Sequence, residues 1–416
     1  MAHWFHRNPL KATSRVSFEL RQVASTTSCR QLCSDLERSR NKLLDILADP
    51  NIEIATLEEA SKYYLSLLHG LVKPVGEETT EDSKLRHAVK FRWTNTLCGG
   101  IPCEHHDSVY EVYCIVFDMG LWYTKHAAKI AAASEKTSEE EAKEVHKCLR
   151  TAAGLFDFAK NLIAKLLEAG DKSHDTDTRV VEAYILQCKA EAQEVAIARA
   201  IERELSLSLR SSLALETART FEAADLALVS QDEKIVLKWR KYFQLKHAFY
   251  MAYAYTYHGE MLLKEDKCGE AIRSVQESVK YIDKADAAGK EYANAKGPGT
   301  TCKPWEHAFF RKLRPDVGRT LEKCERENGF IYHQKVPAEI PELELKAEYG
   351  LAKPEPFVQP EPHKSWTKTV YDQFDITKND HLGEQDPKKK KEQEGDIPAV
   401  KEADIPQKNT TSCVIS

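Results

Sequence analysis

Apolar residues recur at intervals of three and four along most of the chain, the spacing of amphipathic α-helices that bury one face. No stretch shows the sustained two-residue alternation of a half-buried strand. The pattern predicts an all-α fold with helices at 15–47, 56–71, 82–97, 106–133, 138–168, 176–228, 232–265, 268–293 and 304–328. We expect the longest helix to break near 206–212, and we expect a small β-hairpin around 4–18.

One pair of these helices has the pattern of a helix-turn-helix repeat unit, within residues 253–281. Gly259 supplies a close-packing position in the first helix, and residues 266–269 form the turn. Small or branched side chains line the second helix at Ala271, Val275 and Val279. No fixed period repeats this unit elsewhere, so we predict solenoid-like stacking of helices and not a regular repeat array.

Prolines change the pattern in the last part of the chain. Between 336 and 365 they prevent a continuous helix and favour extended backbone, while apolar residues continue. We predict that this segment runs extended along a helical domain spanning 1–365. Residues 366–412 are polar and charged, which is typical of a disordered tether. About 50 flexible residues would reach about 40 Å in root-mean-square terms, enough for the domain to swing without a fixed orientation.

The composition limits the classes of function. Charged residues make up 30% of the chain and the formal net charge is -5, which argues against a general nucleic-acid binder. No secretory signal begins the sequence, and no apolar run approaches the ~18 residues that a membrane span requires. The 11 cysteines lie singly, without the spacing of a disulfide framework. We therefore expect a cytoplasmic or nuclear protein with reduced thiols.

Cysteine and histidine, the usual zinc ligands, cluster once in the chain. The cluster comprises Cys98, Cys103, His105 and His106. Its spacing matches no common zinc finger, and no second ligand pair follows at a regular distance. We predict a turn with incidental polar side chains and no metal site. An unrecognised thiol or metal enzyme is the alternative.

Two cysteines have a histidine nearby in the sequence, the pairing that a thiol nucleophile requires. Cys148 follows His146, and Cys114 precedes His126. Both pairs fall on predicted helices rich in core residues, where buried structural thiols are the better explanation. No Gly-x-x-x-x-Gly-Lys-Ser/Thr phosphate loop occurs either. We predict no catalytic residues and no cofactor.

The most specific chemical motif is formed by the last four residues, Cys413, Val414, Ile415 and Ser416. A cysteine, two aliphatic residues and a terminal serine form the recognition signal of a protein prenyltransferase, and the serine favours farnesyl. We predict an S-farnesyl group on Cys413 that ties the protein to membranes. One such lipid binds only marginally, so a second contact must assist. The basic run 388–391 lies among acidic residues, so a membrane-bound protein partner is favoured as that contact.

The helical segment 201–221 carries apolar residues on two faces. The first stripe comprises Ile201, Leu205, Leu209 and Leu213. The second, half a turn away, comprises Leu207, Ala214, Ala218 and Phe221. One stripe must meet the core, and the arginines beside the other, Arg199, Arg203 and Arg210, suit an amphipathic partner helix with acidic residues. Periodicity alone favours the other interpretation, a helix between two layers of its own domain.

Four segments occur in an order that points to a known family. They are FRWTN at 91–95, EVYCIVFD at 111–118, RTAAGLF at 150–156 and AQEV at 192–195. Over roughly 3–365 they resemble, in this order, the aromatic-x-Trp motif, the buried central helix and two later segments of the Bro-one (BRO) domain family. This family comprises the helical domain of ALIX-like endosomal sorting proteins. No single segment is specific, but their order together with the terminal prenylation signal is.

The resemblance implies a boomerang-shaped helical domain with a tetratricopeptide-like core. It also implies a concave groove that binds the C-terminal amphipathic helix of a charged multivesicular body protein, a subunit of ESCRT-III. The protein would then be a farnesylated, non-catalytic adaptor, peripheral on endosomal or nuclear-envelope membranes. A peptide-binding helical scaffold for a non-ESCRT partner is the alternative.

The resemblance also assigns residues to the groove. The residues that it places there are Ala196, Leu209, Leu213, Lys147 and Arg199. Ala196 stands where other members carry a bulky aromatic residue, so we expect a shallower groove or one that uses Ile197. Tyr349, in the proline-containing segment, is expected to line the groove as well.

Overall fold

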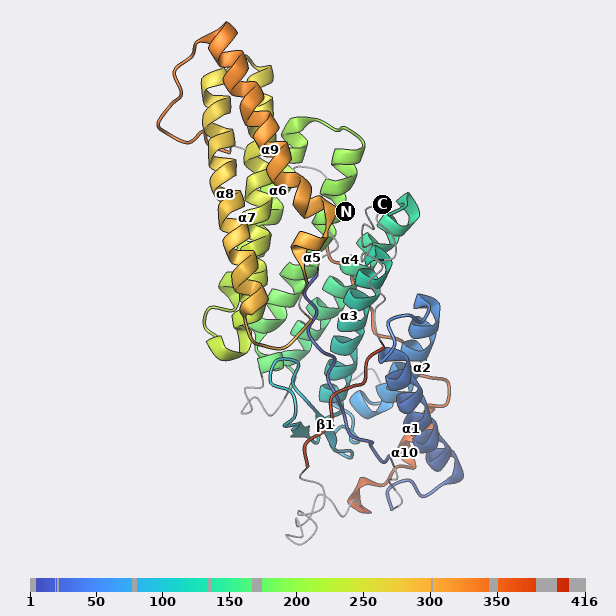
Figure 1. Cartoon of the computed structure of the whole chain (residues 1–416). Coiled ribbons are helices and arrows are strands. Elements are labelled where there is room, and N and C mark those ends of the chain that lie inside the picture. Colours follow the sequence, from blue (N-terminus) through green and yellow to red (C-terminus); the bar gives the residue numbers. More distant parts are fainter. Residues whose placement is uncertain are drawn as a thin grey trace, which may run out of the picture.

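In the computed structural model, the helical pattern of the sequence becomes a succession of long helices (Figure 1). The structure describes residues 5–18, 20, 22–76, 81–132, 137–166, 174–300, 302–343, 351–378 and 395–403. The α-helices among them are α1 Thr27–Leu47, α2 Ile54–Val72, α3 Ser108–Ala132, α4 Glu139–Ile163, α5 Thr178–Glu202, α6 Leu207–Ala227, α7 Glu233–Lys264, α8 Cys268–Asn294, α9 Ala308–Glu327 and α10 Lys368–Asp372. The shorter elements are strands β1 Phe91–Trp93 and β2 Cys103–His105, the 3-10 turns His174–Thr176, Pro304–Glu306 and Ile376–Lys378, and the π-helical turn Asn328–Tyr332. The predicted helical fold class is confirmed.

From α3 to α9 each long helix packs against the one that follows it in the sequence. Figure 1 shows α6 to α9 as one elongated stack, α3 to α5 in the middle, and α1 with α2 at the opposite end. The α7–α8 pair is the predicted helix-turn-helix unit. Gly259 permits its close packing, because a Cβ there would lie 2.5 Å from Cγ2 of Val275.

One strand of a small two-stranded sheet, β1, lies where the sequence predicted a helix. Residues 82–97 form turns followed by β1, so the predicted helix is wrong. Phe91 and Trp93 are buried on either side of the less buried Arg92, the two-residue alternation of a strand. β1 pairs antiparallel with β2, with Phe91 opposite His105. A strand of 3 residues is too short for its alternation to stand out against helical periodicity.

The N-terminal residues 5–18 run through the core as extended backbone. The hairpin expected around 4–18 does not form among the described residues of this segment, which contributes a single bridge between Thr13 and Trp93. Lys11 is 2% exposed, and its ammonium group lies 2.5 Å from a carboxylate oxygen of Asp175. Because buried charge requires a partner, these contacts fix the path of the segment.

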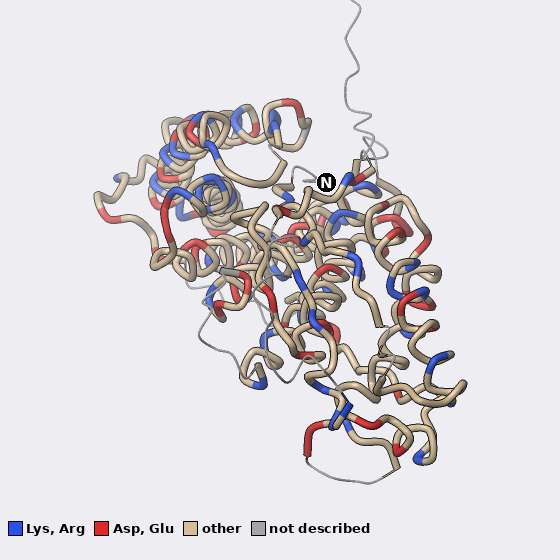
Figure 2. Tube along the Cα trace, turned by 90° about the horizontal axis from the view of Figure 1, so that it is seen from below, with Lys and Arg blue, Asp and Glu red and all other residues tan. Residues whose placement is uncertain are grey.

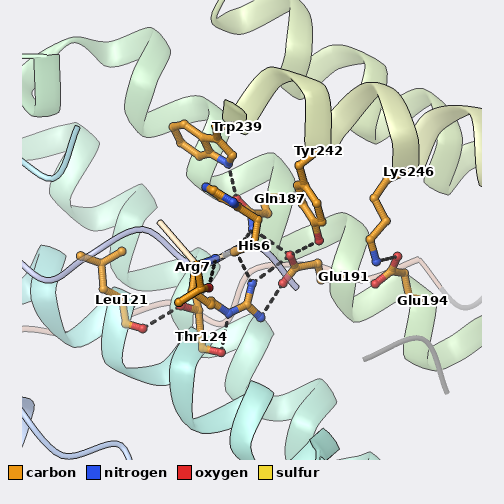
Figure 3. A network of polar contacts seen from close by, with 11 residues as sticks. His6, Arg7, Leu121, Thr124, Gln187, Glu191, Glu194, Trp239, Tyr242 and Lys246 are labelled. Carbon is orange, nitrogen blue, oxygen red and sulfur yellow. Dashed lines mark hydrogen bonds and ion pairs between the residues drawn. The ribbon is translucent and has the colours of Figure 1, made fainter. Parts of the chain in front are cut away.

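A buried polar network connects this segment to the centre of the helical stack (Figure 3). The Arg7 guanidinium lies 2.8 Å from Glu191 of α5, and Glu191 also accepts a hydrogen bond of 2.8 Å from the Tyr242 hydroxyl of α7. One turn further along α5, Glu194 pairs with Lys246 at 2.5 Å. The network therefore holds one face of α5 against α7 and the N-terminal segment.

Residues 351–366, here called the strap, cross back over the helices as extended backbone. The Glu355 amide donates to the Arg150 carbonyl at 3.0 Å. Gly154 of α4 permits this approach, because a Cβ there would lie 1.6 Å from the carbonyl oxygen of Glu355. The strap ends at the buried Trp366. This is the extended path that the prolines predict.

Two stretches that we expected to belong to a free tether are packed against the domain. Phe374, after α10, forms a β-bridge with Ala24 just before α1. Residues 395–403 lie against the β1–β2 loop and α3. The apolar side chains buried in these stretches are Tyr371, Phe374 and Ile397. The expectation of a tether over 366–412 is therefore wrong for 367–378 and 395–403, and the rest of it lies outside the described residues.

Candidate partner-binding surface

α5 has two faces of different character. Its inner face carries the buried residues Gln187, Glu191, Glu194 and Ala198. Its outer face, half a turn around the helix, carries the half-buried Ala196 and Arg199 and ends beside the exposed Arg203. Because the network of Figure 3 holds the inner face, the outer face has a defined orientation.

α5 and α6 meet at a tight turn slightly before the predicted break. Glu204 has φ 50°, the left-handed conformation that reverses the chain. Ser206 caps α6, because its side chain accepts a hydrogen bond of 3.3 Å from the Leu209 amide. Leu205 is 42% exposed within the turn. The turn thus places an exposed leucine and the start of α6 beside the outer face of α5.

The structure divides the predicted contact residues into two groups. Lys147 is exposed, and Ala196, Arg199 and Leu209 are half-buried. Ile197 is 0% exposed and Leu213 is 2% exposed, and both belong to the hydrophobic core. These two side chains pack α5 and α6 against the core and offer no surface to a partner, which corrects the expectation that they do.

The arginines of this surface are held partly by α4. Glu139, in the first turn of α4, lies 2.9 Å from Arg199 and 2.7 Å from Arg203. Hydrogen bonds from Lys143 and Arg199 lower the pKa of Glu139, so the carboxylate stays ionised at neutral pH. Exposed ion pairs of this kind contribute little to stability. An acidic group on a partner can therefore compete for these arginines.

Arg210, one residue after Leu209, has an incomplete set of partners. Its guanidinium carbon lies 5.7 Å from the ring centroid of Tyr257 on α7. Its Nε is buried and has no hydrogen-bond partner among the residues that the structure describes. The residue as a whole is half-buried, so its positive charge adds to that of Arg199 at this surface.

The strap forms one border of the surface. The Ala352 amide donates to Gln193 Oε1 at 2.8 Å, about one turn before Ala196 on α5. Leu351 is 44% exposed at this border. Leu351 is one of the apolar residues that continue between the prolines of 336–365, a usable signal, but no partner contact was predicted for it from the sequence. Tyr349 lies outside the described residues.

The residues that resembled a metal or thiol site have structural surroundings. Within the described ranges no group of three or more His, Cys, Asp or Glu side chains could hold a metal ion. Burial raises the pKa of the Cys148 thiol to about 12 and that of Cys114 well above its usual value, which disfavours the reactive thiolate. Nδ1 of His126 lies 2.8 Å from the carbonyl oxygen of Pro50.

The helices in the described part of the chain carry charges of both signs. None of its helices combines the length and apolarity needed to cross a bilayer. In Figure 2 basic and acidic residues are interspersed along the helices. Residues 413–416 and the basic run 388–391 lie outside the described residues.

Sequence comparisons match most of the chain to one family. The model of the BRO1-like domain family matches residues 8–377. BROX of Danio rerio is 48% identical over 416 residues, covering 100% of both chains. BROX of Homo sapiens is 49% identical over 379 residues, covering 91% of this chain and 92% of the relative. The BROX homolog of Caenorhabditis elegans is 41% identical over 388 residues, covering 91% of each.

Solved structures share the fold at lower identity. A Bro1 domain studied as the structural basis for endosomal targeting aligns with a TM-score of 0.64 at 20% identity, over 92% of this chain and 99% of that one. The ALIX BRO1 domain in complex with CHMP4C aligns with a TM-score of 0.65 at 20% identity, over 87% of this chain and 98% of that one. The resemblance drawn from four sequence segments is thus confirmed, and it supports the expectation of a non-enzymatic protein. The chain belongs to the BRO1 domain family.

Proposed function

We propose that this protein is an adaptor that binds the C-terminal amphipathic helix of a charged multivesicular body protein, a subunit of ESCRT-III. The supporting observation is the accessible pair Leu205 and Leu209, which lies between Arg199 and the incompletely partnered Arg210. A helix with an apolar stripe and acidic neighbours complements such a surface. The ALIX BRO1 domain, which has the same fold, forms a complex with CHMP4C.

The direct contacts in this proposal are the accessible members of the predicted set. Leu209 and Ala196 supply apolar contact, and Lys147 and Arg199 supply positive charge. The small side chain of Ala196 leaves a shallow contact, to which the exposed Leu205 and Leu351 add apolar area. A scaffold that binds a non-ESCRT peptide through the same surface is the rival proposal.

We further propose that an S-farnesyl group on Cys413 holds the adaptor on endosomal or nuclear-envelope membranes. A single prenyl chain binds a bilayer only marginally. Once the lipid holds the adaptor on a membrane, a partner anchored in the same membrane is at high local concentration. The weak lipid contact and the weak partner contact therefore reinforce each other.

Binding of an ESCRT-III peptide tests the adaptor surface. We expect Leu209→Asp to weaken binding of a C-terminal charged multivesicular body protein peptide about 10- to 100-fold, because a carboxylate would replace a central apolar contact. Titration calorimetry measures the Kd. Leu226→Asp is the matched control, since Leu226 lies on the same helix and is 63% exposed. Leu213 is unsuitable because its burial makes Leu213→Asp a folding defect.

Two outcomes would count against the adaptor proposal. The parent protein would bind no charged multivesicular body protein peptide, or Leu209→Asp and Leu226→Asp would weaken binding equally. In the first case, selection of binding peptides from a random library would identify the chemistry of the rival partner. Circular dichroism of each variant confirms that the fold is retained.

Lipidation is tested separately. The intact mass of the protein purified from cells reports whether Cys413 carries a farnesyl group. We expect Cys413→Ser to move the protein from the membrane to the soluble fraction, with Ser412→Ala as the control. Membrane association that persists in Cys413→Ser would refute the lipid as the anchor.

A further inference from the structure

Residues 395–403, here called the docking segment, are attached to the domain at both ends. At one end the Ile397 amide donates to the Gly100 carbonyl in the β1–β2 loop at 3.2 Å. At the other end the Ala403 amide donates to the Ala48 carbonyl at the end of α1, at 3.1 Å. Figure 1 shows the segment, in dark red, passing from beside β1 toward the α1–α2 pair.

Side chains reinforce these backbone contacts. Ile397 is 7% exposed, and Val400 packs against the core. Glu402 accepts a hydrogen bond of 3.0 Å from the Leu10 amide and lies 2.6 Å from the ammonium group of Lys125 on α3. Lys125 is 4% exposed, so Glu402 supplies the negative charge that this buried ammonium group requires.

The attachment changes the length of chain between the domain and Cys413. Cys413 follows the last turn, which ends at Lys378, by 35 residues, but it follows Ala403 by only 10 residues. A flexible chain of the longer length has a root-mean-square span of about 33 Å, and the shorter one about 17 Å. Fully extended, the shorter chain reaches at most about 35 Å.

The short reach is small compared with the domain. A globular unit of this size has a radius of gyration of about 22 Å, so its far surfaces lie about 40 Å or more from any exit point. A lipid at the end of a short chain can therefore bring only the surface around the exit to the bilayer. The exit lies beside Ala48, at the turn of residues 48–53 that joins α1 to α2.

We propose that the docking segment orients the protein on the membrane, with the surface around residues 48–53 facing the lipid. This inference rests on the proposed farnesylation of Cys413. A tether of about 50 residues would let the domain take any orientation on the membrane. The docked segment instead makes one surface of the domain face the lipid. Charges of both signs, such as Glu53 and Lys401, surround the exit, so chain length and not charge attraction sets the orientation.

The test compares two surface positions on vesicles. A fluorophore is attached through a non-natural amino acid at position 53, beside the exit, or at position 330, where the side chain is 81% exposed at the far end of α9. Farnesylated full-length protein is bound to phosphatidylcholine vesicles with an acceptor dye, at millimolar lipid because one prenyl chain binds weakly. We expect energy transfer from position 53 to exceed that from position 330 at least three-fold.

Release of the docking segment should remove this difference. The release variant combines Ile397→Asp with Glu402→Ala, and the control combines Asp396→Ala with Lys401→Ala at exposed positions of the same segment. We expect the transfer ratio to approach one in the release variant and to stay unchanged in the control. Hydrogen exchange in solution should show the Ala403 amide, which neither variant replaces, exchanging at least 10-fold faster in the release variant than in the control.

The outcomes separate this inference from the proposed function. A ratio near one in the bound parent, or an unchanged ratio after release, overturns the orientation while the lipid anchor stands. If the farnesylated parent binds no vesicles, the lipid anchor fails, and equal exchange in both variants would overturn the docking segment as well. A ratio that appears only when phosphatidylserine is added would show that charge attraction, and not chain length, sets the orientation.

Discussion

Two extended segments, one near each end of the described chain, meet on α3 and are held by different chemistry. Residues 5–18 run through the core with the side chains of Arg7 and Lys11 in buried ion pairs, to Glu191 and Asp175. Residues 395–403 lie partly at the surface and are attached by backbone hydrogen bonds, Ile397 and the Glu402 carboxylate.

Extended backbone has little stability of its own and depends on what its side chains bury. Separating a fully buried ion pair leaves a charge without solvent or partner, at a cost of several kcal/mol. Peeling off a half-exposed peptide exchanges its hydrogen bonds for those of water, at a cost of about 1 kcal/mol each. We therefore expect the N-terminal segment to open only with the whole domain and the docking segment to open alone.

The largest effect should come from breaking the N-terminal attachment. Glu191→Ala leaves the buried Arg7 without its carboxylate, so we expect a loss of about 4 kcal/mol in the free energy of unfolding, measured with urea. Glu291→Ala is the matched control, because Glu291 is 56% exposed in its pair with Lys241. We expect a loss below about 1 kcal/mol there. Similar losses in both variants would contradict the comparison.

Acid should loosen the N-terminal segment through His6. Burial lowers the pKa of His6 from 6.5 to about 3. Between these values the unfolded state binds a proton that the folded state does not, so stability falls as the pH falls. At pH 5 this amounts to about 2 kcal/mol relative to pH 7.5. We expect His6→Gln to lose about 2 kcal/mol less than the parent over this interval in urea unfolding; parallel losses would refute the assignment.

A substitution beneath the strap should change the strap locally, with little effect on global stability. Gly154→Ala places a Cβ 1.6 Å from the Glu355 carbonyl oxygen and must displace the strap, while alanine favours α4 by about 1 kcal/mol. We expect a change of about 1 kcal/mol or less in global stability, with faster hydrogen exchange at Ala352 and Glu355. Gly318→Ala on α9, where a Cβ meets open space, is the control. Strap amides that stay equally protected in both variants would show that the strap does not depend on Gly154.

Helical periodicity is local, and it predicted the fold class and most helices. The pairing of Phe91 with His105 is not local, so the sheet was missed. The burial of charged side chains was equally hidden, because the partner of Lys11 lies at Asp175 and that of Arg40 at Glu111. Each residue alone looks like a surface residue.

Because periodicity is local, it also could not tell which residues of the candidate partner-binding surface are accessible. Periodicity places Leu209 and Leu213 on one stripe of α6, yet only Leu209 is accessible. Burial depends on where the neighbouring helix begins to cover the stripe, and Ser211 already bonds the Ala254 carbonyl of α7 at 2.7 Å. The docking segment was missed for another reason, since Ile397 and Val400 are two isolated large apolar residues in a long charged stretch and show no helical or strand period.

The threaded N-terminal segment has a consequence for synthesis of the protein. The Arg7 carbonyl accepts a hydrogen bond of 2.9 Å from the Thr300 amide, so residues 5–18 leave the ribosome long before neighbours that are made nearly 300 residues later. At about 5–20 residues per second, that interval is about 15–60 s. Until then the segment's charged groups stay in water, and the helices of the centre lack the ion pairs that hold them. The beginning of the chain can take its place only when most of the chain has been translated.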